Sequence, residues 1–200
     1  MPLHGCVTPL IGRLASGIRP SVSGMTIEMT PVMDETGTLL STLDRIRRTF
    51  AWKCGGLSDE QLRQRLEPSR ITLGWLLKHL AFCEDHYFTA VLAGNGYPDV
   101  WASYGPDEEG WDWRTEAEDT ADGLMELWEG AVARSRRSTA EALGRNGMDT
   151  LATNPEWQVE ANARRYVADM IEEYARHTGH ADLIRESIDG LVGEDPRDGE

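Results

Sequence analysis

Two histidines and one glutamate stand where the sequence pattern directs side chains into a protein interior. Glu173 and His177 are four residues apart, so a helix would carry them on adjacent turns of one face. His79 stands in the middle of the apolar face of a second predicted helix. Imidazole and carboxylate groups bind divalent metals, and three protein ligands leave one coordination position open, as in catalytic sites. A metal site made by His79, Glu173 and His177 is therefore one interpretation of this pattern.

The unfavourable energy of a buried charge supports this interpretation. Glu173 shares its predicted helix face with the apolar residues Met170 and Ile184. A carboxylate in such a place is strongly unfavourable unless a cation or hydrogen bonds compensate it. Spacing alone also fits a simpler arrangement, in which His79 is a hydrogen-bonded core histidine and Glu173–His177 is an ordinary helix pair. The residues by themselves leave both interpretations open.

Four neighbouring side chains are candidates for supporting roles. His86 and His180 could orient a ligand, transfer a proton or contact a substrate, or they could be polar residues at the rim. Cys83 follows His79 by one turn and could be a further ligand, although a small cysteine in a helix is more often part of the packing. Arg185 could hold an anionic group, but we expect it on a solvent-exposed face. We expect no catalytic residue beyond the metal site itself.

Apolar residues that recur every three or four positions predict the helices that carry these side chains. The predicted helices cover residues 36–53, 58–66, 72–93, 115–143 and 161–188. Ser58 with Gln61, and Thr115 with Glu118, form capping-box patterns at two of the starts. Four of the helices are long and amphipathic, and no segment shows strand-like alternation. The chain is therefore predicted to be an all-α four-helix bundle.

Charged residues within these helices are expected mostly on outer faces. Lys78 and Asp85 fall off the apolar face of the helix at 72–93, and Arg47 belongs to an arginine cluster that is directed mostly outward. The connector at 146–160, between the last two long helices, is predicted to be a loop.

A long aromatic loop, residues 94–114, joins the second long helix to the third. Among its Gly, Pro and Asp residues are five large rings, which are Tyr97, Trp101, Tyr104, Trp111 and Trp113. Loops of this length inside a compact domain often have a function, so its tryptophans are candidates for the mouth of the site. The alternative is that the rings only cover an open end of the bundle.

One domain with a tail at each end is the expected organisation. Residues 1–32 are rich in Pro, Gly and Ser and lack helical periodicity, which predicts a disordered or non-native N-terminal tail. Residues 33–193 would form the bundle, and residues 194–200 a polar C-terminal tail.

Composition narrows the choice of partners. The 200 residues carry a formal net charge of −14 and no run of Lys or Arg, which argues against nucleic acid and anionic membranes as partners. No apolar stretch approaches the roughly 20 residues that a membrane span requires. Three widely spaced cysteines do not suggest a disulfide framework, so a reducing cytoplasm is the expected location.

Two segments resemble the signature regions of the DinB/YfiT-like superfamily, and more closely its mycothiol-dependent, mini-circle-protein-like branch. They are TLGWLLKHL at 72–80 and EYARHTGHAD at 173–182, and the similarity spans residues 33–190. The resemblance implies that His79 is the metal histidine of the first region, and that Glu173 and His177 are the ligand pair of the second. Glu173 departs from the family's His-x-x-x-His form but resembles the pattern of mycothiol-dependent maleylpyruvate isomerase. His180 falls where many members carry Gln.

The resemblance implies a function as well as a fold. It predicts a homodimer that holds a divalent metal, zinc first and nickel or iron as alternatives. The co-substrate would be mycothiol or a similar low-molecular-weight thiol, and the reaction would be S-transfer or isomerisation of a small electrophile. Coordination to the metal would keep the thiol as a nucleophilic thiolate, so the protein needs no catalytic cysteine.

Two rival functions use the same residues. The bundle could be a metal-binding or interaction protein without turnover, whose aromatic loop recognises a partner. It could also be a non-haem iron enzyme that uses oxygen, because two histidines and one carboxylate make the facial triad of such sites. Metal analysis combined with thiol-consumption assays separates the three.

Overall fold

The computed structural model describes residues 33–104, 110–114, 118–156 and 158–195. The tail predicted over residues 1–32, the last residues of the polar C-terminal tail (196–200) and Thr115 of the predicted capping box lie outside the described residues. The described residues belong to one compact unit, Pro31–Glu200. Within the described ranges, every helix is too short or too polar to cross a lipid bilayer.

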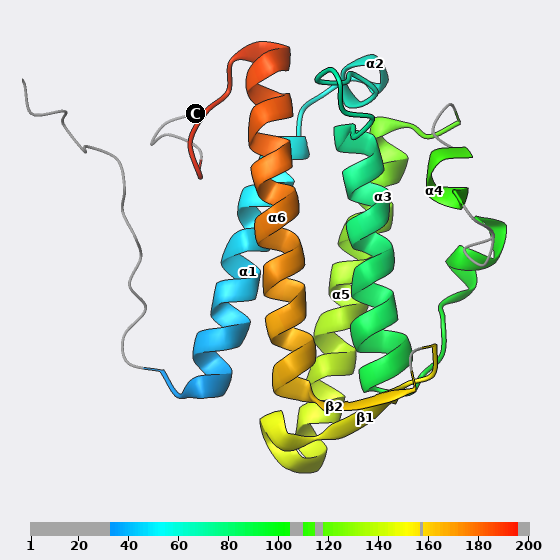
Figure 1. The fold of residues 1–200 in the computed structure, drawn as a ribbon, viewed down its shortest axis with the longest axis vertical. Helices are drawn as coiled ribbons and strands as arrows, with labels where there is room; N and C mark the ends of the chain where they lie inside the picture. The colour runs from blue at the N-terminus through cyan, green and yellow to red at the C-terminus, as the bar shows by residue number, and fades with distance from the viewer. Residues whose placement is uncertain (1–32, 105–109, 115–117, 157, 196–200) are drawn as a thin grey trace, which may run out of the picture. The chain divides into compact units, whose positions relative to one another are not determined.

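Four long helices form the bundle that the periodicity predicts. They are α1 (Glu35–Cys54), α3 (Leu73–Glu84) with its π-helical continuation η1 (Asp85–Leu92), α5 (Ala121–Asn146) and α6 (Ala163–Asp189). Figure 1 shows them side by side, with α1 packed mainly on α6 and α3 mainly on α5. α3 also packs on α6, which brings the two signature segments together. The prediction of an all-α four-helix bundle is confirmed.

Side-chain caps define where the helices of the signature segments begin. The hydroxyl of Thr72 accepts a hydrogen bond from the backbone N–H of Trp75 at 3.0 Å at the start of α3. The side chain of Asn162 accepts from the backbone N–H of Arg165 at 3.0 Å at the start of α6. Each cap satisfies a backbone donor that the first helical turn leaves without an intrahelical partner. The caps therefore fix the register in which α3 and α6 present their side chains.

Two helices differ from their predicted form. α5 begins at Ala121, after the N-cap residue Thr120, which is later than the start predicted at Thr115. The predicted helix at 72–93 is continuous, but it changes from α-helical to π-helical at Asp85. π-helical turns insert one residue into the helical repeat and are frequent near functional sites. The change lies just beyond His79 and Cys83.

The connections contain shorter elements. They are α2 (Asp59–Leu62), the 3₁₀ turns η2 (Asp99–Ser103) and η3 (Gly147–Asp149), α4 (Trp111–Arg114), and the strands β1 (Leu151–Asn154) and β2 (Val159–Asn162). The capping box of Ser58 and Gln61 is confirmed at the start of α2.

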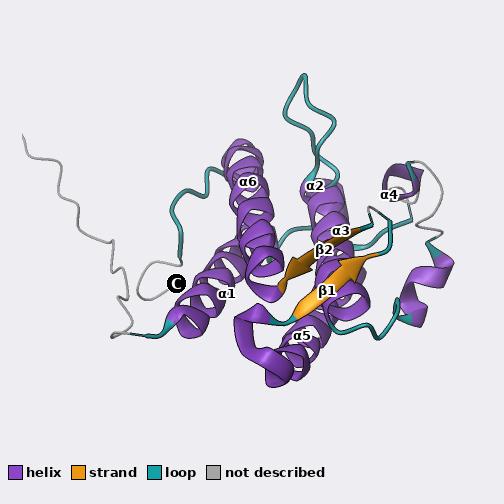
Figure 2. Ribbon diagram, turned by 60° about the horizontal axis from the view of Figure 1, so that its bottom comes forward, coloured by secondary structure: helices purple, strands orange, loops and turns teal. Residues whose placement is uncertain are grey.

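The prediction of a plain loop between residues 146 and 160 is wrong. β1 and β2 form an antiparallel hairpin, with Leu151 opposite Asn162 and Asn154 opposite Val159. Figure 2 shows this hairpin across the end of the bundle where α5 ends and α6 begins. Each strand has only four residues, and Leu151 and Val159 are exposed rather than part of the core, so the sequence gives too short a pattern to reveal them.

Charged side chains that were expected to point outward lie in the core instead. Arg47 is buried and donates from Nε to Oε1 of Glu84 at 2.7 Å. Asp85 is fully buried and accepts from Arg134 at 2.7 Å and from the indole of Trp101 at 2.9 Å. The outward placement predicted for Arg47 and Asp85 is therefore wrong. Opposite charges on neighbouring helices make their burial tolerable.

Lys78 and Arg185 also differ from their predicted placement. Lys78 is fully buried and forms an ion pair with Asp119. Arg185 is buried and donates from Nη1 to the backbone carbonyls of Lys53 at 3.0 Å and Gly55 at 2.7 Å. Arg185 thus ties α6 to the end of α1, so the exposed face predicted for it is wrong.

Candidate metal centre

The three predicted ligands converge from two helices. α3 supplies His79, and α6, which lies beside it in Figure 1, supplies Glu173 and His177. Oε1 of Glu173 lies 2.9 Å from Nε2 of His79 and 3.1 Å from Nε2 of His177. One nitrogen or oxygen atom of each residue lies within 4.8 Å of those of the other two. Residues far apart in the chain therefore form one compact donor cluster, called here the His–Glu–His cluster.

The cluster is only partly shielded from water. The side chains of His79 and Glu173 are each 25% exposed, and that of His177 is 8% exposed. Hydrogen bonds from His177 and His79 hold the pKa of the Glu173 carboxyl well below its ordinary value, although burial opposes this. Burial alone would lower the pKa of His79, but Cys83 and Glu173 together raise it to about 10. The carboxylate is therefore ionised, and part of its side chain is accessible to solvent.

An indole supports His79 from within α3. Trp75 stands one turn before His79 and stacks on its ring, with 4.7 Å between centroids and 7° between planes. Nε1 of Trp75 donates to the carboxylate of Asp112 at 2.7 Å, and Trp113 stacks on the same indole. α4 thereby fastens the aromatic loop to the cluster. Sequence reasoning placed Trp75 only on an apolar face; its i, i+4 spacing to His79 is the signal that could have identified this contact.

The tryptophans of the aromatic loop divide between two places. Trp113 reaches the His–Glu–His cluster through Trp75. Trp101, by contrast, is 1% exposed, and Trp111 packs against Trp101 and Phe82. A position at the mouth of the site therefore fits Trp113 and does not apply to Trp101, whose ring is part of the core.

His180 contacts the cluster from one side. Its Nδ1 lies 3.2 Å from Nδ1 of His177, so one of these nitrogens donates a hydrogen bond and the other accepts it. His177 thus presents Nε2 to Glu173 and Nδ1 to His180. Burial, His177 and Arg176 lower the pKa of His180, which favours its neutral form. A partner of this kind fixes the tautomer and the ring orientation of a metal-binding histidine.

His86 belongs to a different set of contacts. Its Nδ1 lies 2.6 Å from the hydroxyl of Tyr97, and its Nε2 lies 3.2 Å from the side-chain nitrogen of Asn154. Tyr97 begins the aromatic loop and Asn154 ends β1. His86 therefore connects η1 to the loop and to the hairpin, and these contacts favour a structural role over a direct role at the cluster.

Cys83 lies close to one ligand but outside the cluster. Its Sγ is 3.7 Å from Nε2 of His79, and the residue is 9% exposed. Among the described residues, the set of three donors whose ligand atoms all lie within 4.8 Å of one another is His79, Glu173 and His177, without Cys83. The arrangement fits the packing role expected for this thiol.

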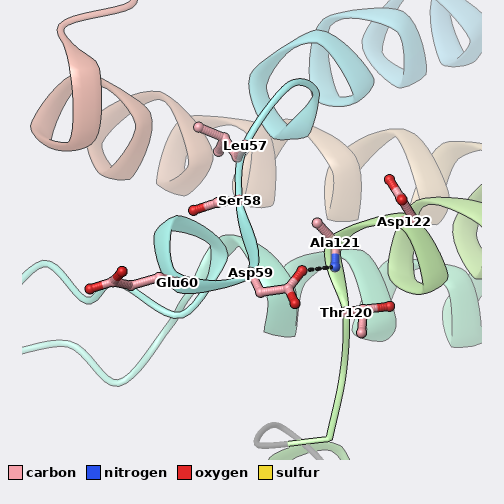
Figure 3. Close-up of a pocket in the computed structure, with 7 residues that line it drawn as sticks. All are labelled: Leu57, Ser58, Asp59, Glu60, Thr120, Ala121 and Asp122. Carbon is pink, nitrogen blue, oxygen red and sulfur yellow. Dashed lines mark hydrogen bonds between the residues drawn. The ribbon is translucent and has the colours of Figure 1, made fainter.

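A separate hollow lies between α2 and the start of α5. Figure 3 shows its lining, which consists of Leu57, Ser58, Asp59, Glu60, Thr120, Ala121 and Asp122. Asp59 accepts a hydrogen bond from the backbone N–H of Ala121 at 2.7 Å, while Ser58 and Thr120 cap their own helices. These groups hold α2 against α5, and none of them belongs to the His–Glu–His cluster. We therefore interpret this hollow as structural.

The donor set of the cluster fits a divalent metal. Two imidazole nitrogens and a carboxylate oxygen form many catalytic zinc sites, and the same set suits non-haem iron. The two Nε2 atoms both hydrogen-bond to one carboxylate oxygen, Oε1 of Glu173. His79 of α3 and Glu173 and His177 of α6 would hold a divalent cation with ligand atoms from both helices. His180 supplies the outer partner that such a site requires.

The fold and the cluster together define a helical-bundle protein with a candidate His–Glu–His metal centre. The model of the mycothiol-S-transferase (MST) family matches residues 38–190. This match covers more than half of the chain, so the chain belongs to that family, and the resemblance seen in the two signature segments is confirmed. No curated protein matches the chain.

Proposed function

We propose that this protein is a metal-dependent S-transferase that joins a low-molecular-weight thiol to a small electrophile. The family match points to mycothiol or a similar thiol as one substrate. His79, Glu173 and His177 are the proposed ligands of one divalent ion, with zinc as the first choice.

The observation that carries the proposal is the way in which the Glu173 carboxylate is paired. Oε1 of Glu173 contacts Nε2 of both His79 and His177. Within the described part of the chain its ion pairs involve only these two imidazoles, and no Lys or Arg. An imidazole can give up its proton and become a neutral metal ligand. A carboxylate paired only with imidazoles therefore keeps its negative charge available for a cation. The position of the cluster, part-exposed and next to Trp75 and His180, supports substrate access.

Each residue has a separate part in the proposed chemistry. A divalent ion with these three ligands would lower the pKa of a bound thiol so that it reacts as the thiolate. Glu173 contributes the only formal negative charge of the ligand set, which leaves net positive charge for an anionic sulfur. Trp75 and His180 hold the rings of His79 and His177. In the transfer, sulfur bonds to the electrophilic carbon, the leaving group departs with its electron pair, and the thiol proton passes to solvent.

Elemental analysis combined with a thiol screen tests the proposal. We expect the purified protein to bind zinc or another divalent ion in a one-to-one ratio. With mycothiol and N-methylchloroacetamide as substrates, we expect thiol consumption that stops when a chelator removes the metal and resumes when metal is added. Glutathione and N-acetylcysteine serve as alternative thiols in the same assay.

The outcomes separate the proposal from its rivals. Zinc or nickel together with thiol transfer supports a transferase. Stoichiometric metal without turnover of any thiol would identify a binding protein, and iron with oxygen uptake would identify an oxygen-using enzyme. Thiol transfer that persists without bound metal would show that the His–Glu–His cluster acts in another way.

A further inference from the structure

A small hollow lies next to the His–Glu–His cluster, on the side of His180. Its volume is about 90 Å³, and its lining consists of Leu66, Ser69, Ile71, His180, Leu183 and Ile184. This volume corresponds to roughly three water molecules of about 30 Å³ each. The six lining residues, all of them described, include no Lys, Arg, Asp or Glu. The lining therefore favours an uncharged, apolar group.

His180 connects the hollow to the cluster. The side chain lines the hollow, and its Nδ1 lies 3.2 Å from Nδ1 of His177. His177, His180 and Ile184 follow one another at intervals of three and four residues along one side of α6. One helical turn rises about 5.4 Å, so a group bound at the cluster reaches the hollow across a few covalent bonds.

The opposite wall of the hollow comes from the chain that leads into α3. Ile71 precedes Trp75 by four residues, and Trp75 stacks on His79. The hydroxyl of Ser69 accepts a hydrogen bond from the backbone N–H of Ile71 at 3.1 Å, so the only hydroxyl of the lining already has a partner. The hollow thus lies between α6, which carries Glu173 and His177, and the chain that leads into α3, which carries His79.

Two lining leucines leave apolar surface in water. Leu183 is 58% exposed and Leu66 is 37% exposed. Single exposed leucines are common on protein surfaces and need no explanation. Here, however, the two flank a hollow lined by His180, which contacts the proposed ligand His177. An apolar group seated in the hollow would cover part of the exposed surface of both.

We propose that this hollow binds the apolar arm of the electrophile, a short alkyl or aryl group a few bonds from the carbon that sulfur attacks. The inference rests on the proposed function, because it takes the His–Glu–His cluster as the place of reaction. An electrophile with such an arm would be held with its reactive carbon toward the cluster. Each methylene group buried in the hollow would raise kcat/KM by up to about fourfold.

A pair of electrophiles with one reactive group and two arm lengths tests this inference. N-methylchloroacetamide and N-butylchloroacetamide react with a thiol in the same way: the C–S bond forms, the C–Cl bond breaks, chloride leaves with the electron pair, and the thiol proton passes to the buffer. We expect the protein to prefer the butyl compound by about tenfold in kcat/KM. In Leu183→Asn the preference should fall to about threefold or less.

The chain offers a matched control for this substitution. Leu151 is also 58% exposed, but it lies on β1, at the other end of the bundle (Figure 1). Leu151→Asn should keep both the activity and the tenfold preference. An equal loss of preference in both variants, or an unchanged preference in Leu183→Asn, would overturn the inference.

Binding of unreactive analogues distinguishes failure of the hollow from failure of the proposed function. N-butylacetamide should shift the methyl NMR signals of Leu66, Ile71, Leu183 and Ile184, whereas N-methylacetamide should not. If these shifts occur while no thiol is ever consumed, the hollow binds an apolar arm and the proposed transferase activity is wrong. If the shifts are absent, the inference that the hollow binds an apolar arm is wrong. A change of sedimentation in Leu183→Asn, with unchanged preference, would also overturn it, since the hollow would then be a contact between two copies.

Discussion

Two carboxylates of the bundle, Glu84 at the end of α3 and Glu173 in α6, are compensated in opposite ways. Glu84 is fully buried and accepts from Nε and Nη2 of Arg47 at 2.7 and 2.5 Å. The hydroxyl of Tyr174 donates to it at 2.8 Å. Glu173 is part-exposed, and both of its ion-pair contacts are imidazoles on one oxygen atom. One carboxylate therefore has a permanent cation as its partner, while the other does not.

The difference shows which of the two regions can change state. A guanidinium stays protonated at every ordinary pH. Burial alone would lower the pKa of Arg47, but Glu84 more than offsets this, so the pKa lies above its ordinary value. The Arg47–Glu84 pair is thus complete in the folded chain and stabilises one packing of α1 on α3. An imidazole can release its proton and bind a metal instead. Under the proposed function, the His–Glu–His cluster exchanges protons for a cation, whereas the Arg47–Glu84 pair only stabilises the packing.

Removal of a proposed ligand should give the largest functional effect. His79→Ala and His177→Ala should each abolish stoichiometric metal binding and lower thiol transfer by at least about a thousandfold, because two remaining ligands bind a divalent ion weakly. Elemental analysis and initial rates measure both losses. His86→Ala is the matched control, since His86 contacts Tyr97 and Asn154 instead. Full metal content in either ligand variant would contradict the assignment.

Charge-neutral substitution of the two carboxylates should separate the regions most directly. Glu84→Gln removes the buried anion of Arg47 and leaves only the part-exposed Asp44, 2.9 Å from Nη1, so we expect a loss of about 3 kcal/mol in the free energy of unfolding. Glu173→Gln should lower the stability of the metal-free protein far less, because its imidazole partners can become neutral. It should, however, weaken metal binding by at least about tenfold.

Urea unfolding and metal titration on both variants measure these effects. We expect Glu84→Gln to lower mainly the free energy of unfolding and Glu173→Gln to lower mainly the affinity for metal. Should Glu173→Gln bind metal as tightly as the parent, Glu173 is not a ligand, and His180 becomes the next candidate because it contacts His177.

Metal removal should lower the melting temperature, and the difference should grow with pH. At a free metal concentration of about 100 times Kd, binding stabilises the fold by about 2.7 kcal/mol. The pKa of His79 is raised from 6.5 to about 10 in the folded protein. Protonated His79 therefore stabilises the metal-free fold fully below pH 6.5, and this stabilisation is lost as the pH rises toward about 10. Over the same range the metal meets less competition from protons. The metal-dependent shift of Tm should therefore be larger at pH 8.5 than at pH 6.5.

The Arg47–Glu84 pair provides the contrast for this pH series. Because Arg47 keeps its charge throughout the range, the effect of Glu84→Gln on stability should be the same at both pH values. Calorimetry of metal-loaded and chelator-treated protein at pH 6.5 and pH 8.5 gives the metal-dependent shift of Tm at each pH, and calorimetry of Glu84→Gln at the same two pH values gives the contrast. A metal-dependent shift that shrinks as pH rises would show that His79 does not exchange a proton for the metal.

The sequence predicts the parts of this comparison that depend on local spacing. Four long helices follow from apolar residues at three- and four-residue intervals, and the convergence of Glu173 and His177 follows from their i, i+4 spacing. That His79 would meet them required the family resemblance, because spacing within one helix does not say which neighbouring helix faces it. The fold and the three clustered residues were accessible in this way, and their role as metal ligands stays a proposal.

The sequence does not predict the features that depend on how helices are rotated against each other. Arg47 reads as an outward residue of α1, yet its partner Glu84 lies in another helix, and only packing brings the two together. Lys78 and Asp85 read as outward for the same reason and are buried beside Asp119 and Arg134. Periodicity assigns charges to water by default, so every buried ion pair contradicts it.

The smallest expected effects concern the outer partners of the two regions. Nδ1 of His180 contacts His177, and Oγ of Ser135 accepts from Nη2 of Arg47 at 3.1 Å. His180→Ala should weaken metal binding by about tenfold, the effect typical for loss of an outer partner of a metal-binding histidine, and leave the stability of the metal-free protein nearly unchanged. Ser135→Ala should lower stability by about 1 kcal/mol and leave metal affinity unchanged.

A conservative variant shows whether His180 acts by positioning His177. His180→Asn places an amide oxygen or nitrogen near the position of Nδ1, so it should restore most of the metal affinity that His180→Ala loses. A structural role alone would lower the melting temperature of the metal-free protein in both variants and would not distinguish Asn from Ala in metal affinity. If His180→Ala binds metal as the parent does, the His177 ring is held by α6 packing alone. The difference between the two carboxylates would then rest on their direct partners, Arg47 for Glu84 and the two imidazoles for Glu173.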